Sequence, residues 1–205
     1  MKLRGIFLLS LGVLFGACTI LPEARESFYY AIEYESPPEL PGAAGLGVAR
    51  IFETSVSPAY DRRQIVVRDD SPRYQYLNED LWGVELRAAM QMLLERYFEE
   101  VPTFQLVLGE LARGSADYEI HSSIRRAEYV QGSPARARME IVLEARTTDT
   151  IPQTVARYHL VEDETIGEDG GLQEFASLIN EFMLQAVYRF DEALRDELGG
   201  ERSES

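Results

Sequence analysis

Two apolar stripes with helical spacing place the strongest constraint on how this chain can fold. The first predicts a helix that starts near Asn78, with Asn78 as a candidate N-cap. Its stripe consists of Trp82, Leu86, Ala89 or Met90, Leu93 and Tyr97. The second predicts a helix over 172–198, stopped by the two glycines at 199–200. Its stripe consists of Phe175, Leu178, Ile179, Phe182, Ala186, Val187, Phe190 and Leu194. Both stripes require burial against another layer.

Strand-like segments fill most of the remaining chain and supply that layer. They are 28–34, 46–55, 64–69, 73–78, 104–108, 117–130, 136–146 and 153–161. Apolar and charged side chains alternate along 136–146, which is typical of an antiparallel strand with one solvated face. An acidic loop is expected at 162–171. The predicted fold class is α+β, with two long amphipathic helices packed on one face of an antiparallel sheet.

The first 17 residues are typical of an export signal that ends directly before a cysteine. Lys2 and Arg4 form a short basic start, an apolar run covers 5–15, and two small residues precede Cys18. The apolar run is shorter than the roughly 20 residues that a membrane-spanning helix needs. Cys18 is the only cysteine of the chain, so it has no partner for a disulfide.

This small-small-cysteine ending resembles a bacterial lipobox. It predicts cleavage after residue 17, a diacylglyceryl group on the Cys18 thiol, and a palmitate-type chain on the new N-terminus, which together give a firm anchor. An ordinary signal peptide with a chance cysteine is the alternative. The residue after the acylated cysteine influences which membrane the lipoprotein reaches, and Asp at that place favours the inner membrane. This chain has Thr19 there, which predicts a lipoprotein of the cell outer membrane that faces the periplasm. The expected organisation is a signal peptide (1–17), a lipidated tether (18–27), one domain (28–198) and a flexible tail (199–205).

Charge and residue chemistry exclude several functions. Without the signal, 18 basic residues face 35 acidic ones, so the formal net charge of −17 argues against nucleic acid as a partner. The two histidines, His121 and His159, both fall within strand patterns and lack the spacing of a metal site. Neither a nucleophile elbow nor a phosphate-binding loop occurs. We therefore expect no enzyme, no catalytic residue, no cofactor and no metal.

The segment 57–98 carries a resemblance to a known family. Pro58, Tyr60, Asp61, Arg62, Gln64, Ile65, Val66 and Arg68 are followed by Tyr76 and by Trp82 near a helix start. This pattern resembles the ABC-type transport auxiliary lipoproteins, the family of the paraquat-inducible protein C component. The resemblance covers about residues 28–198.

The resemblance implies a non-enzymatic lipoprotein of an intermembrane lipid transport system. Its implied partners are a cell-entry-domain substrate-binding protein and an ABC permease and ATPase, with a phospholipid as a further candidate. An outer-membrane assembly or cell-wall accessory lipoprotein, acting on a machine unrelated to lipids, is the alternative function.

Residue types suggest two roles within the motif. Tyr60, Asp61 and Arg62 are expected to form part of a partner-binding surface, whereas Trp82 and Leu86 are expected to hold the first helix to the sheet. A purely structural interpretation also fits. In it Tyr60 and Trp82 fill the seam between helix and sheet, and Asp61 pairs with Arg62 or Arg63 on the surface.

Overall fold

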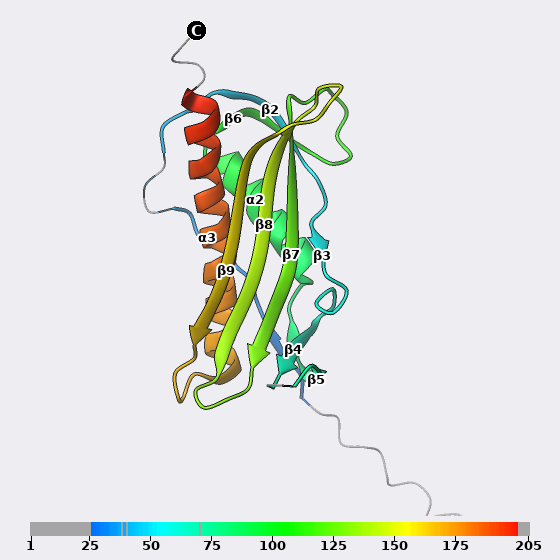
Figure 1. Ribbon diagram of the computed structural model, residues 1–205, viewed down its shortest axis with the longest axis vertical. Helices are drawn as coiled ribbons and strands as arrows, with labels where there is room; N and C mark the ends of the chain where they lie inside the picture. The colour runs from blue at the N-terminus through cyan, green and yellow to red at the C-terminus, as the bar shows by residue number, and fades with distance from the viewer. Residues whose placement is uncertain (1–25, 38, 40, 70, 201–205) are drawn as a thin grey trace, which may run out of the picture.

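Three long antiparallel strands form one side of the sheet (Figure 1). They are β7 (Tyr118–Val130), β8 (Arg136–Thr147) and β9 (Thr154–Thr165), with β9 at the edge of the sheet. The computed structural model describes residues 26–37, 39, 41–69 and 71–200. In β8 the predicted alternation is confirmed, because Met139, Ile141, Leu143 and Ala145 are all at most 1% exposed. The long strands thus bury one face and leave the other to polar side chains.

Three short strands line the other edge of β7, one after another. β2 (Leu46–Ile51), β3 (Ser55–Val56) and β4 (Gln64–Arg68) each run parallel to it. Beyond them, β6 (Phe104–Gly109) pairs in parallel with β2, and β5 (Tyr74–Trp82) pairs antiparallel with β4. β1 (Phe28–Tyr30) runs parallel to β5. The α+β class is therefore confirmed, but the nine-stranded sheet is mixed and not purely antiparallel as predicted.

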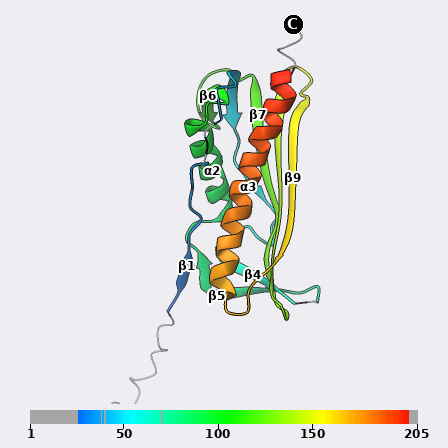
Figure 2. The same cartoon turned by 90° about the vertical axis from the view of Figure 1, so that its left-hand side faces the viewer.

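Two helices cover the same face of the long strands (Figure 2). They are α2 (Leu86–Glu100) and α3 (Gly171–Gly200). The core between the layers contains Trp82, Phe175, Phe182 and Phe190, each at most 2% exposed. Neither helix in the described part of the chain combines the length and apolar character that a bilayer span requires.

Several predicted boundaries differ from the structure. The first helix begins at Leu86 rather than near Asn78, because 78–82 continue β5 between β4 and β1. The residue before it, Glu85, makes no side-chain cap bond. The predicted acidic loop begins later, since β9 extends to Thr165. The last helix continues through Gly200, so the expected stop at the two glycines is wrong.

Candidate functional site

The motif that carries the resemblance forms a corner between β3 and β4. A tight turn folds residues 57–63, in which the amide N–H of Tyr60 donates to the Ser57 carbonyl at 2.8 Å. The turn directs the Tyr60 side chain inward and leaves Asp61 and Arg63 exposed. This corner therefore joins one buried residue of the motif to a charged surface.

Tyr60 reaches a buried carboxylate on β7. Its side chain is 4% exposed, and its hydroxyl donates to Oε2 of Glu128 at 2.8 Å. Burial, followed by hydrogen bonds to Tyr74 and Glu128, raises the pKa of the Tyr60 hydroxyl well above its ordinary value. The expectation that Tyr60 forms part of an exposed surface is therefore wrong for its side chain. The structural interpretation is also wrong for Tyr60, because its side chain contacts Glu128 on β7 and Tyr74 on β5 and lies outside the core between helices and sheet.

Glu128 is fully buried and is surrounded by arginines. Arg68, Arg138 and Arg126 approach its carboxylate at 3.6, 3.8 and 4.0 Å. All three arginines are partly exposed, so their guanidinium groups connect the buried acid to solvent. The corner is thus held by a charge network that spans β4, β7 and β8.

Tyr60→Phe is expected to lower the free energy of unfolding by about 1–3 kcal/mol, because the buried Glu128 carboxylate loses its hydroxyl donor. Urea unfolding followed by circular dichroism measures the change. Tyr76→Phe is the matched control, since Tyr76 is 36% exposed. Equal stability of the two variants would show that the Tyr60 hydroxyl does not support the corner.

Asp61 makes its ion pair with the first helix. Nη2 of Arg87 lies 2.5 Å from Oδ2 of Asp61, and Nη1 of Arg87 lies 3.3 Å from Oε1 of Glu53. The hydrogen bond to Asp61 is the largest contribution that raises the pKa of Arg87. The predicted pairing of Asp61 with Arg62 or Arg63 is therefore wrong, because the turn aims Asp61 at α2.

The two arginines that follow Asp61 contact aromatic rings and backbone. The guanidinium carbon of Arg62 lies 3.8 Å from the ring centre of Tyr76. Arg63 donates to the carbonyl oxygens of Trp82 and Gly83 at 3.2 and 2.8 Å. Arg62 and Arg63 therefore keep defined positions on the outer surface of the corner.

Trp82 and Leu86 join the motif to the core. Both side chains are 2% exposed. The Trp82 ring packs against the ring of Phe175 on α3, with ring centres 5.8 Å apart. Their predicted place between helix and sheet is confirmed. Trp82 itself ends β5 and does not lie in the helix.

The histidines lie in the sheet, as the strand patterns predicted. His121 stacks on Phe52 with ring centres 4.8 Å apart, and Nε2 of His159 lies 3.1 Å from Oε1 of Glu140. Within the described ranges, no group of three or more histidines, cysteines and acids is placed to hold a metal ion.

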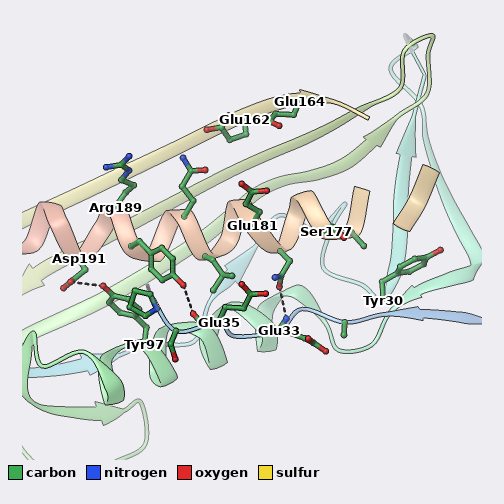
Figure 3. Close-up of a pocket in the computed structure, with 18 of the residues that line it drawn as sticks. Tyr30, Glu33, Glu35, Tyr97, Glu162, Glu164, Ser177, Glu181, Arg189 and Asp191 are labelled. Carbon is green, nitrogen blue, oxygen red and sulfur yellow. Dashed lines mark hydrogen bonds between the residues drawn. The ribbon is translucent and has the colours of Figure 1, made fainter. Parts of the chain in front are cut away.

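A groove of about 1600 Å³ runs along α3 (Figure 3). Its walls are β1 with the segment that follows it and the end of β9, which contributes Glu162 and Glu164. The segment is fixed to α3, because the Glu33 amide donates to Asn180 at 2.8 Å and the Tyr188 hydroxyl donates to the Glu35 carbonyl at 2.6 Å. No local pattern in the sequence indicates this groove, since these partners are about 150 residues apart.

Cys18, the candidate lipidation site, and Thr19 lie outside the described residues. The described residues define an α+β domain whose conspicuous surface features are a charged corner and an acidic groove. A family model for the ABC-type transport auxiliary lipoprotein component matches residues 30–182. The chain therefore belongs to that family.

Solved structures share the fold. A Xanthomonas campestris protein of family DUF330 is 15% identical with a TM-score of 0.70, covering 87% of this chain and 99% of its own. A protein described as uncharacterized is 12% identical with a TM-score of 0.57, covering 82% of this chain and 98% of its own. No curated protein matches the chain.

Proposed function

We propose that this protein is a non-enzymatic, lipid-anchored component of an ABC-type system that moves lipids between the two membranes of the cell envelope. The family match over residues 30–182 carries the proposal. The lipobox-like sequence before Cys18 supports the anchor, because it places an acylation site ten residues before Phe28, where the first strand begins. A cell-entry-domain protein and the ABC permease and ATPase are the proposed partners.

We assign partner binding to the exposed side of the corner, around Asp61 and Arg62. Its charges are held at fixed positions by Arg87 and by the Tyr76 ring, so little side-chain entropy is lost when a partner binds. The buried Tyr60 side chain stabilises the turn that carries this surface, through its hydrogen bond to Glu128. Its part in binding is indirect.

The double variant Asp61→Ala with Arg62→Ala is expected to weaken capture of the cell-entry-domain partner in a pull-down. Its stability should fall by only about 0.5–2 kcal/mol, because an exposed ion pair contributes about 0–1 kcal/mol and an exposed cation–π contact about 0.5–1 kcal/mol. Thermal melting measured on the same preparations checks that the domain is folded.

Arg87→Ala is the matched control for this variant. It removes the same ion pair to Asp61 but leaves Asp61 and Arg62 in place. Capture should persist in Arg87→Ala, weakened only by the side-chain entropy that ordering Asp61 then costs on binding, about 0.5–1.5 kcal/mol. If that variant loses the partner as completely as the double variant does, the ion pair only positions the turn, and the assignment of Asp61 and Arg62 as contact residues is wrong.

Cys18→Ala is expected to abolish acylation and to move the protein out of the membrane. Three acyl chains anchor a protein firmly, because each buried methylene contributes about 0.8 kcal/mol. Labelling with a palmitate analogue measures acylation, and sucrose-gradient fractionation measures location. The unchanged protein should band with outer-membrane markers, as Thr19 predicts. Equal labelling of the two proteins would exclude Cys18 as the attachment site, and banding with inner-membrane markers would exclude the proposed sorting.

A further inference from the structure

Three arginines lie beside three exposed tyrosines at one end of the sheet. The guanidinium carbons of Arg62, Arg63 and Arg68 lie 3.8, 5.5 and 5.3 Å from the ring centres of Tyr76, Tyr29 and Tyr74, in that order. The three tyrosines are 36%, 60% and 42% exposed, and the neighbouring Phe28 is 54% exposed. We call Phe28, Tyr29, Tyr74 and Tyr76 the aromatic end.

The aromatic end belongs to adjacent strands. Tyr29 on β1 is in register with Leu81 on β5, and Tyr74 and Tyr76 lie on the same strand β5. Tyr74 is in register with Arg68 on β4, so the arginines and tyrosines form one continuous surface. The buried Tyr60 ring packs edge-on against the Tyr74 ring, with ring centres 5.9 Å apart.

This surface lies at the end of the molecule where the described chain begins. β1, β4 and β5 occupy the lower end in Figure 2, whereas β6 and the last turns of α3 occupy the upper end. Phe28 is ten residues from Cys18. Since an extended chain spans at most about 3.3–3.6 Å per residue, a lipid on Cys18 would hold Phe28 within roughly 36 Å of its attachment point.

We propose that the aromatic end rests on the headgroup region of the membrane that holds the acyl chains. Tyrosine and arginine suit this region, because each combines an apolar body with a polar tip and aromatic rings concentrate at membrane–water interfaces. The arginines match the phosphate groups of lipids. The inference rests on the proposed lipid anchor and adds a defined orientation to it.

The contact has a consequence for the partner surface. Asp61 and Arg62 border the aromatic end, because Arg62 itself stacks on Tyr76. With the aromatic end on the membrane, a partner at Asp61 would bind beside the lipid surface. The acidic groove along α3 would meet the lipid surface at this end, because Phe28 and Tyr29 also line the groove.

Site-specific fluorescence quenching tests the orientation in the full-length lipoprotein. Tyr29→Cys carries an environment-sensitive fluorophore, and Leu111→Cys is the matched control, because Leu111 is 96% exposed and follows β6 at the other end. Phe28→Cys provides a second position at the aromatic end. Each protein is reconstituted in vesicles of phosphatidylethanolamine and phosphatidylglycerol that contain nitroxide lipids, and flotation measures binding to the vesicles.

The labels at 29 and 28 should be quenched, and the label at 111 should not be. Protein that floats with the vesicles but shows no quenching at 29 and 28 overturns the membrane contact and leaves the anchor intact. Quenching that is equal at 29 and 111 overturns the orientation. Protein that does not float overturns the lipid anchor itself, and the inference falls with it.

Discussion

Replacing Trp82 with alanine is expected to lower the free energy of unfolding by about 3–5 kcal/mol, the cost typical of removing a large buried aromatic side chain. Trp82 is 2% exposed and packs on Phe175 of α3, so the substitution leaves a cavity where β5, α2 and α3 meet. The loss is a large part of the about 5–15 kcal/mol that stabilises a typical domain.

The melting temperature should fall by roughly 6–20 °C, since about 1 kcal/mol shifts a domain of 150–250 residues by about 2–4 °C. Thermal unfolding followed by circular dichroism measures this change. Val84→Ala is the matched control, because Val84 lies two residues further on and is 46% exposed. If the two variants have the same melting temperature, Trp82 does not hold the helices to the sheet.

Asp191→Ala is expected to lower the free energy of unfolding about as much as Trp82→Ala does, but for an electrostatic reason. Asp191 is 1% exposed and accepts hydrogen bonds from Tyr97 at 2.9 Å, Thr103 at 2.5 Å and Arg195 at 2.7 Å. These bonds tie α3 to α2 and to the residue before β6. Removing one partner of a buried ion pair typically costs about 3–5 kcal/mol, because the other charge and the hydroxyls lose their acceptor.

Glu192→Ala is the matched control for Asp191→Ala. Glu192 is the next residue and pairs with Arg189 on the exposed side of α3, where an ion pair contributes about 0–1 kcal/mol. Urea unfolding of both variants measures the difference. A loss in Asp191→Ala no larger than in Glu192→Ala would show that the buried network does not stabilise the junction of the helices.

Local patterns predicted the elements, and pairing between distant segments decided their ends. The stripe from Phe175 to Leu194 and the alternation from Met139 to Ala145 predicted a helix and a strand that the structure confirms. The start of α2 was wrong because β5 continues to Trp82, where it is held by β1 and β4. The parallel pairs along β7 left no local sequence signal, so the sheet was predicted to be antiparallel.

At the corner, too, the local pattern identified the core residues but not the contacts between distant residues. Helical spacing identified Leu86 as a core residue, and Trp82 fitted the same stripe although it ends a strand. The bond from Tyr60 to Glu128 joins residues 68 apart, and the ion pair from Asp61 to Arg87 joins residues 26 apart. Residue type alone could not show that Tyr60 turns inward while Asp61 turns toward α2.

Affinity capture of the full-length lipoprotein from detergent-solubilised membranes of its own host tests the central claim most directly. Mass spectrometry of the captured proteins should identify a cell-entry-domain protein with its ABC permease and ATPase. Their recovery should fall in the double variant Asp61→Ala with Arg62→Ala and persist in Arg87→Ala. Capture of outer-membrane assembly or cell-wall proteins, with no component of an ABC transporter, would contradict the account.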